Sequence, residues 1–445
     1  MRQGVLMGLM TALALVLSAC GGGGSGGGDN LDSAGDNVSN QPRQLFFSAY
    51  DANGSELWVS DGTEAGTRMV KDINPGSASS APYVLAAIGE TIYFTADDGT
   101  HSRELWKSDG TEAGTVMVKD TCSNNCESYL SSPLAFNNKL YFSAFDGIHG
   151  RELWVSDGTA EGTKMVKNIN TTTGCEGECG SNPDDLTVAN GVLYFTAITG
   201  LATKRELWKS DGTEAGTVMV KDIHPGGESY PDYLRAYNNK LYFSAYHPDS
   251  GTELWKTDGT EAGTVLVKDI YPGTAESYPS YMTVFNNRLY FVAWTTTGSG
   301  ELWKSDGTEA GTVLVKDGFT QDIDQLAVVG NTLYLKVDKT LWKTDGTTAG
   351  TVVVKEIVSA APDNLTAVNN RFLFSADYKL WVSDGTEAGT QELWTNPSPG
   401  PYPEVKGVAG GALLFIGPDG GSSSLWKSDG TAAGTLKVKD IAPLK

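Results

Sequence analysis

The residues that could most readily bind a cation are nine aspartates, each in the sequence Asp-Gly-Thr. Ca²⁺ takes clustered carboxylate and carbonyl oxygens, so a calcium site is one interpretation. Each Asp-Gly-Thr segment supplies one or two carboxylates, however, and the spacing of a calcium-binding loop is absent. An Asp that bonds nearby backbone N–H groups in a turn is the simpler role. We therefore expect turn residues and no cofactor, with Ca²⁺ as the less favoured alternative, at Asp61, Asp109, Asp157, Asp211, Asp258, Asp306, Asp345, Asp384 and Asp429.

Four cysteines form two pairs with identical spacing, Cys122 with Cys126 and Cys175 with Cys179. Outside the cytoplasm such pairs usually form disulfides. We favour the two local pairings, each of which would pin a loop. A bridge between the two loops is the second possibility. A zinc site made of all four thiolates is the third, because thiols in an oxidising compartment usually pair with one another.

Five tyrosines give the strongest indication of a binding site. Tyr129, Tyr230 and Tyr278 end Glu-Ser-Tyr segments, and Tyr233 and Tyr281 end Pro-x-Tyr segments. If these rings lie exposed at one end of the molecule, their flat apolar faces would suit a glycan or a peptide. The alternative is that Tyr233 and Tyr281 begin a strand and belong to the core.

Outside the Gly-rich segment at residues 21–28, motifs of the common enzyme classes do not occur in the sequence: Gly-x-Ser-x-Gly, His-Glu-x-x-His, Walker and dinucleotide-binding patterns are all absent. Residues that break the repeat, such as Trp294 and Trp394, compose no nucleophile–base pair. We therefore predict no catalytic residue, leave enzymatic activity open and favour a protein without it. The four histidines form no metal-ligand motif and lie in or near predicted loops: His101, His149, His224 and His247.

The elements that position these residues come from one unit of about 45 residues, repeated nine times after residue 43. Each unit is centred on Leu-Trp-x-(Ser/Thr)-Asp-Gly-Thr. In the unit at 233–270, four segments rich in aromatic and β-branched residues have the composition of strands. An Asn-Asn turn, a variable loop and the Asp-Gly-Thr turn separate them. Each unit is therefore predicted to be a four-stranded antiparallel meander.

A sheet of this size cannot bury both of its faces alone. Repeats of about 40–50 residues with four strands each are typical of β-propellers, whose sheets pack face to face around an axis. We predict an all-β fold, a single β-propeller of eight or nine four-stranded antiparallel blades over residues 44–445. The first unit starts directly at Leu45, so its first strand is either missing or supplied by residues 30–43. Two smaller propellers or an open arc are the alternatives.

A glutamate precedes Leu-Trp in the first six units, and a Val-Lys pair recurs in the last strand of most units. We expect the Glu to be structural and to form an exposed ion pair with the recurrent Lys of a neighbouring strand. Such a pair contributes little stability. Thr340, Lys379 and Ser424 replace this Glu in the last three units.

The full motif, Glu-Leu-Trp-x-x-Asp-Gly-Thr-x-x-Gly-Thr followed by Val-Lys-Asp-Ile, resembles the ELWxxDGT repeats of bacterial surface proteins that are also called hyalin-like. Residues 56–73, 206–223 and 253–270 carry the whole pattern. The resemblance covers about nine-tenths of the chain. It implies a secreted or surface repeat protein and assigns no chemistry.

The N-terminus resembles that of bacterial lipoproteins. An apolar segment at residues 4–17, too short to span a membrane, ends in Leu17-Ser18-Ala19-Cys20, which matches a lipobox. The resemblance implies a signal peptide at residues 1–19 and lipidation of Cys20. Gly21 stands where an inner-membrane retention signal would place Asp, so an outer-membrane or cell-surface location is implied. Residues 20–43 would form the lipidated Cys and a flexible Gly-rich tether.

Composition limits the partners. The chain has 445 residues, with 33 basic and 54 acidic side chains and a formal net charge of −21. Nucleic acids and anionic lipid surfaces both need a basic face, so neither is expected as a partner. We expect a monomeric lipoprotein, bound to the membrane only through its lipid, that acts as a binding or adhesion module for a polysaccharide or protein. A glycan-active enzyme with its site in the propeller channel and a purely structural envelope component are the alternatives.

Overall fold

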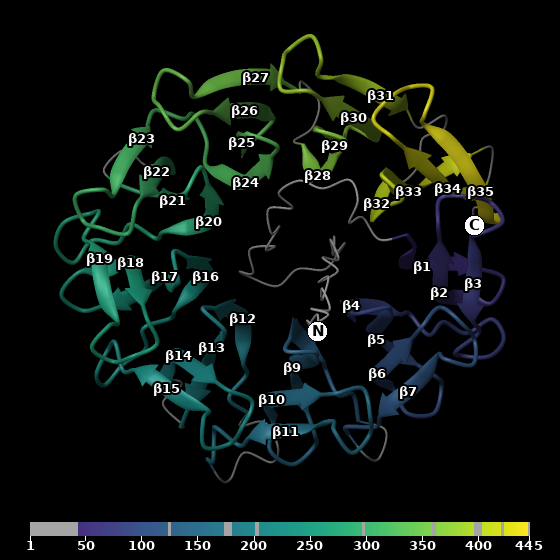
Figure 1. Cartoon of the computed structure of the whole chain (residues 1–445), viewed down its shortest axis with the longest axis horizontal. Coiled ribbons are helices and arrows are strands. Elements are labelled where there is room, and N and C mark those ends of the chain that lie inside the picture. The colour runs from purple at the N-terminus through teal and green to yellow at the C-terminus, as the bar shows by residue number, and fades with distance from the viewer. Residues whose placement is uncertain are drawn as a thin grey trace, which may run out of the picture.

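The computed structural model describes residues 43–122, 126–172, 180–200, 204–295, 299–357, 362–395, 403–419 and 422–443. They form nine antiparallel sheets set around a central axis like the blades of a propeller (Figure 1). These described residues include no helix, and therefore none that is long and apolar enough to cross a membrane. The predicted all-β propeller is confirmed, and it has nine blades.

The strands of blades 1 to 5 are β1 (Leu45–Asp51), β2 (Gly54–Ser60), β3 (Arg68–Lys71); β4 (Tyr83–Ile88), β5 (Thr91–Asp97), β6 (Arg103–Ser108), β7 (Val116–Lys119); β8 (Ser131–Phe136), β9 (Lys139–Phe145), β10 (Arg151–Ser156), β11 (Lys164–Lys167); β12 (Asp184–Ala189), β13 (Val192–Thr199), β14 (Lys204–Ser210), β15 (Val218–Lys221); and β16 (Asp232–Tyr237), β17 (Lys240–His247), β18 (Gly251–Thr257), β19 (Val265–Lys268). Those of blades 6 to 9 are β20 (Ser280–Phe285), β21 (Arg288–Ala293), β22 (Glu301–Ser305), β23 (Val313–Lys316); β24 (Ile323–Val329), β25 (Thr332–Val337), β26 (Thr340–Thr344), β27 (Val352–Glu356); β28 (Asp363–Val368), β29 (Arg371–Ala376), β30 (Lys379–Ser383), β31 (Gln391–Thr395); and β32 (Glu404–Ala409), β33 (Ala412–Asp419), β34 (Ser422–Ser428), β35 (Leu436–Pro443).

Every blade is a meander in which strands pair in chain order, with the first strand nearest the axis (Figure 1). Blade 1 differs, because its described sheet has three strands, β1, β2 and β3. By sequence, β1 corresponds to the second strand of the other blades. Residues 30–43 are one predicted source of the missing first strand, and all of them except Arg43 lie outside the described residues.

The core consists of nine apolar layers, one between each pair of neighbouring blades. Strand alternation sends adjacent side chains of the motif into different layers. In blade 5, Leu254 packs against blade 6, whereas Trp255 packs against blade 4. Both side chains are buried. Each small sheet therefore depends on the two neighbouring blades to bury its two faces.

The ring is closed by contacts between blades 9 and 1. Leu45 and Trp58 share an apolar cluster with Leu425 and Val438. The Nζ atom of Lys439 donates a hydrogen bond to the carbonyl of Thr67 at 2.7 Å, as equivalent lysines do between other neighbouring blades. This closure excludes both an open arc and two smaller propellers.

The Asp-Gly-Thr aspartates are turn residues, as predicted. In blade 5, Asp258 Oδ1 accepts hydrogen bonds from the backbone N–H and the hydroxyl of Thr260 at 3.0 and 2.7 Å. These bonds favour the ionised form and hold the pKa of Asp258 below its usual value. A side chain at Gly263 would collide with the carboxylate, which explains the second glycine of the motif. The same pattern recurs in the other eight blades.

The prediction of an exposed Glu–Lys ion pair is wrong. The glutamates before Leu-Trp are buried in all six blades that carry them. In blade 5, Glu253 Oε2 accepts hydrogen bonds from the backbone N–H of Ile270 at 2.8 Å and from Ser277 Oγ at 2.6 Å. The connection between two blades crosses this carboxylate and needs an acceptor for its N–H groups.

The recurrent lysine reaches the next blade instead. Lys221 donates to the carbonyl of Thr264 at 2.9 Å and lies 6.0 Å from the ring centroid of Trp255. The lysine therefore joins two blades by a hydrogen bond and a cation–π contact.

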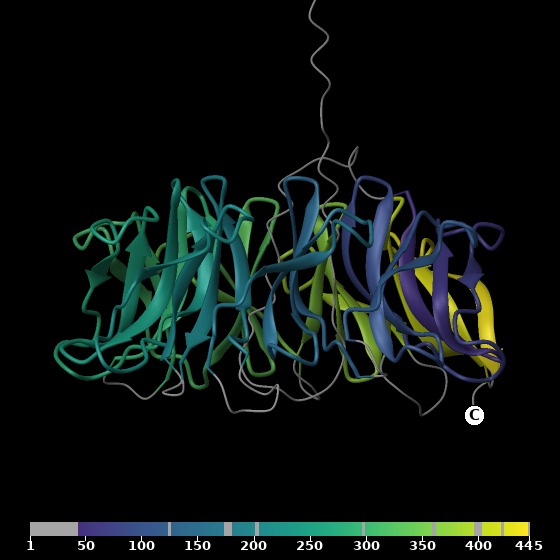
Figure 2. The ribbon, with the colours of Figure 1, turned by 90° about the horizontal axis from the view of Figure 1, so that it is seen from below.

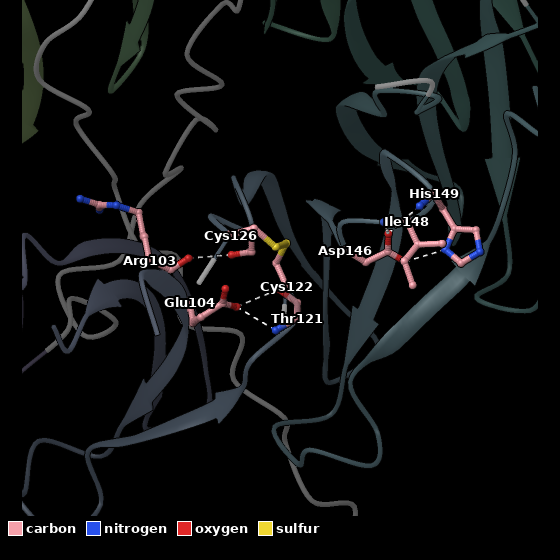
Figure 3. Close-up of a disulfide and its surroundings, with 9 residues drawn as sticks. Arg103, Glu104, Thr121, Cys122, Cys126, Asp146, Ile148 and His149 are labelled. Atoms are coloured by element: carbon pink, nitrogen blue, oxygen red, sulfur yellow. Dashed lines mark hydrogen bonds and ion pairs between the residues drawn. A yellow bond between two sulfur atoms is a disulfide. The ribbon is translucent and has the colours of Figure 1, made fainter. Parts of the chain in front are cut away.

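A disulfide joins Cys122 to Cys126 in the connection between blades 2 and 3, which confirms the first local pairing (Figure 3). The connection is also fixed by Thr121, whose N–H and hydroxyl donate to Glu104 Oε2 at 2.9 and 2.8 Å (Figure 3). Cys175 and Cys179 lie outside the described residues.

Candidate functional site

The two faces of the ring differ in what they present. The Asp-Gly-Thr turns and the Asn-Asn turns lie on one face. The connections between blades and the loops between second and third strands lie on the other face, at the bottom of Figure 2, where β35 also ends. We call it the connection face.

An open groove of about 1280 Å³ lies on the connection face between blades 5 and 6. It is lined by residues of two inter-blade connections and of the strands that follow them. Aromatic and acidic side chains dominate, and none of the described lining residues is Lys or Arg. The lining consists of His224, Glu228, Tyr230, Asp232, Tyr233, Ser244, Tyr246, Thr252, Glu276, Tyr278, Pro279, Ser280 and Trp294.

The outer rings of the groove are Tyr230 and Tyr278, which are 60 % and 51 % exposed. Each follows a buried serine, Ser229 or Ser277, that is bonded to the buried glutamate of the preceding blade. Both tyrosines have a φ of +45°. A bulky residue in this left-handed region carries a conformational cost of about 1–2 kcal/mol. The hydrogen bonds of the preceding serine hold the backbone in this conformation and therefore set the direction of the tyrosine ring.

A second pair of rings comes from equivalent positions at the ends of the second strands. Tyr246 packs edge-on to His224, with ring centroids 5.2 Å apart. Trp294 packs edge-on to Tyr278 at 6.2 Å, and its Nε1 donates to Asp322 at 3.2 Å. The indole is therefore held from two sides.

The floor of the groove lies at the start of the innermost strands. Tyr233 has a φ of +54° in a bulge of β16, and burial raises the pKa of its hydroxyl to about 12. Ser280 is 3 % exposed, and its Oγ has no hydrogen-bond partner among the described residues. A buried hydroxyl without a protein partner is available to a bound ligand or to solvent.

Next to the floor, two carboxyl groups from neighbouring inner strands form a pair. Asp185 of β12 and Asp232 of β16 are hydrogen-bonded to each other. Burial and the charges of Asp232 and Asp184 raise the pKa of Asp185 to about 8. Burial also raises the pKa of Asp232. One proton is therefore shared by the pair near neutral pH.

The structure brings three of the five predicted tyrosines into one groove: Tyr230, Tyr233 and Tyr278. Tyr281 is partly buried against the layer between blades 6 and 7, with its ring 5.7 Å from that of Tyr233. Tyr129 occupies the position of Tyr230 in blade 3, outside this groove. Its ring lies under the guanidinium of Arg151 at 5.4 Å.

Sequence reasoning missed the second half of the groove. Tyr246, Asp232 and Ser280 carried no signal, because each lies at a variable position of an ordinary unit. Trp294 did carry one, since nine of the eleven tryptophans occupy the repeat motif and it does not. Trp394, the other exception, is buried against Phe415.

No protein-family model and no curated protein matches the chain. Among solved structures, the chain is similar to the computationally designed Ika8 protein, with a TM-score of 0.45 and 16 % identity over 80 % of this chain and 95 % of that chain. It is also similar to puromycin hydrolase, in a mutant complexed with PGG, with a TM-score of 0.44 and 14 % identity over 76 % and 58 % of the two chains. A structure from a study of two prolyl endopeptidases is similar as well, with a TM-score of 0.44 and 12 % identity over 75 % of this chain and 54 % of that chain. The chain thus spans less than two thirds of the length of these hydrolases.

Proposed function

We propose that this protein is a surface-anchored β-propeller that binds a polysaccharide through the groove between blades 5 and 6. The observation that carries the proposal is the set of four rings, Tyr230, Tyr246, Tyr278 and Trp294, that converge on one open groove. Sugar rings present apolar C–H faces, and aromatic side chains are the usual surfaces against which such faces stack. The polar floor offers hydrogen bonds to hydroxyl groups.

Rigid presentation is the proposed mechanism. Ser229 and Ser277 fix the backbone before the outer rings, and Asp322 holds the indole of Trp294. Rings that are already ordered lose little conformational entropy on binding, so more of the contact energy contributes to affinity. We propose that lipidation of Cys20, after removal of residues 1–19, attaches the propeller to the outer membrane.

The groove favours a polysaccharide over a protein ligand. Its rings line an open groove, which suits a chain of repeating flat units. A protein ligand would also need an apolar anchor buried at the centre of its interface.

A glycan-active enzyme is the second candidate, and the pair Asp185–Asp232 is the observation that favours it. A carboxyl protonated near neutral pH is suited to general acid catalysis. Glycosidases, however, hold their two carboxyl groups about 5–9.5 Å apart, whereas these two are in hydrogen-bond contact. The geometry therefore supports binding more strongly than hydrolysis.

The test measures binding of the folded propeller to a panel of polysaccharides and analyses the same samples for released products. The variants are Tyr230→Asn and Tyr278→Asn, because Asn182 occupies the same position with the same φ of +45° in blade 4. Tyr129→Asn is the matched control outside the groove. Loss of one stacking ring should weaken binding about ten-fold, equivalent to about 1.4 kcal/mol.

Three outcomes would count against the proposal. If the wild-type protein binds no polysaccharide, the proposal is wrong. Equal affinities for the groove variants and the Tyr129→Asn control would place the binding site elsewhere. Released products that disappear in Asp185→Asn would establish the enzyme instead.

A further inference from the structure

One position of the repeat holds a positively charged side chain in some blades and an uncharged one in others. This position directly precedes the buried glutamate of the motif. It holds an arginine in blades 2, 3 and 4, namely Arg103, Arg151 and Arg205. In blade 5 it holds Thr252, and in blade 6 it holds Gly300. The register of the second and third strands confirms the equivalence, since Arg151 is opposite Phe145 and Thr252 is opposite Tyr246.

These arginines make two contacts with groups that the groove also contains. The guanidinium of Arg151 lies 5.4 Å from the ring centroid of Tyr129, which is the counterpart of Tyr230. The guanidinium of Arg103 lies 3.8 Å from Glu127, which is the counterpart of Glu276. The chain therefore places a cation in this space in blades 2 and 3.

In the groove, the same partners remain but the arginine is absent. Tyr230 and Tyr278 present their rings beside Thr252 and Gly300, which have no charge and little bulk. Glu228 and Glu276 line the groove and form no ion pair with a described residue. Arg205, the nearest arginine of this series, belongs to blade 4 and donates to Thr196 and to the carbonyl of Asn182.

We infer that the groove binds the positively charged amino groups of an amino-polysaccharide, a polymer of hexosamine units without acetyl groups. The ammonium group would take the place of the guanidinium, which contacts a carboxylate in blade 2 and a tyrosine face in blade 3. The groove contains both kinds of partner. Cations are attracted to the faces of aromatic rings, and adjacent carboxylates add to this attraction. The inference rests on the proposed polysaccharide function and names its ligand class.

The experiment compares two ligands with the same sugar backbone, a glucosamine hexamer and its fully N-acetylated form, in which each amine has lost its charge and gained an acetyl group. Titration calorimetry uses the folded propeller at about pH 6, which lies below the ordinary pKa of an amine and above that of a free carboxylic acid. The amine form should bind at least ten-fold more tightly, and added salt should weaken it more than the acetylated form.

Two variants test the site. Thr252→Arg restores the arginine of blades 2 to 4 and should abolish binding of the amine hexamer, while the fold tolerates it as blade 3 does. Glu276→Gln keeps the shape and should reduce affinity for the amine form several-fold, with little change for the acetylated form. Arg151→Lys, in blade 3, is the control and should leave both affinities unchanged.

The outcomes separate this inference from the proposed function. Equal or tighter binding of the acetylated hexamer overturns the cationic ligand and leaves the polysaccharide site intact. Binding of neither hexamer, nor of any other polysaccharide, overturns both. A lysine-rich peptide that displaces the amine hexamer at lower concentration would assign the groove to a basic protein instead.

Discussion

Removal of the buried carboxylate of Glu253 should destabilise the protein strongly. Glu253 accepts hydrogen bonds from the N–H groups of Ile270 and Tyr271, at 2.8 and 3.3 Å, and from Ser277 Oγ. In Glu253→Ala, the serine can still donate to the carbonyl of Thr252, but the two N–H groups lose their acceptor. A buried donor without a partner costs about 1–3 kcal/mol, so we expect a loss of about 2–6 kcal/mol.

The pH dependence gives a second, independent reading. Burial raises the pKa of Glu253 from 4.5 to about 7. Because the folded-state pKa is the higher one, the associated stability is complete below pH 4.5 and is lost as the pH rises through 7. The full difference is about 3 kcal/mol. Glu253→Gln does not titrate, so its deficit relative to the wild type should be largest near pH 4.5 and shrink by about that amount above pH 7.

Urea unfolding followed by tryptophan fluorescence at both pH values measures these differences. Glu261→Ala is the matched control, because Glu261 is exposed in the Asp-Gly-Thr turn of the same blade and bonds Thr264 through its backbone carbonyl only. Equal midpoints for Glu253→Ala and Glu261→Ala would refute the role of the buried acceptor. A Glu253→Gln deficit that does not change with pH would refute the raised pKa.

Three further predictions concern the whole ring, the disulfide and the groove. As the pH rises from 5 to 8, the melting temperature should fall, because burial raises the pKa of five such glutamates. As the pH is lowered below about 4, the melting temperature should also fall, because the nine turn aspartates, whose pKa values are lowered in the folded state, become protonated. A melting temperature that is constant across pH 5–8 would contradict the first effect. Reduction of the Cys122–Cys126 disulfide should speed hydrogen exchange in the connection between blades 2 and 3 and cost about 2 kcal/mol there, whereas equally faster exchange in all blades would show that the bond supports the whole ring. Asp322→Ala removes the acceptor of the Trp294 indole and of the backbone N–H of Gly300, and should weaken polysaccharide binding several-fold in calorimetry; an unchanged affinity would mean that binding does not depend on a fixed indole.

The propeller could be predicted because its determinants are local and repeated. The same spacing, turn residues and strand composition recur in the nine units. A strand or turn that is hard to predict in one unit can therefore be predicted from the equivalent segment of another. The bonding of the buried glutamate could not be predicted in this way. Its partner, the serine of Glu-Ser-Tyr, follows it by 24 residues in blade 5 and lies in the next unit of the repeat. Only the path of the connection across the blade brings the two together.

The groove shows the same limit at a larger scale. The sequence predicts Tyr230 and Tyr278 as binding residues. Both rings face one open groove, however, only because the arginine of blades 2 to 4 is absent at positions 252 and 300. Asn182 replaces the tyrosine in blade 4, and Arg151 covers Tyr129 in blade 3. The site therefore arises from departures from the repeat, and a single sequence does not show which departures lie side by side.

Closure of the ring between β1 and β35 sets the order in which the chain can fold. The seam hydrogen bond from Lys439 to Thr67 joins residues 372 positions apart, whereas the equivalent bond from Lys71 spans 44. Contacts of such long separation form late, because much loop entropy is lost before they are made. Until β35 emerges, the apolar face of blade 1 that carries Leu45 and Trp58 stays open to solvent. The folding chain would therefore pass through an incomplete arc whose two ends expose apolar surface, and the yield of folded protein should depend on how quickly the ninth blade forms.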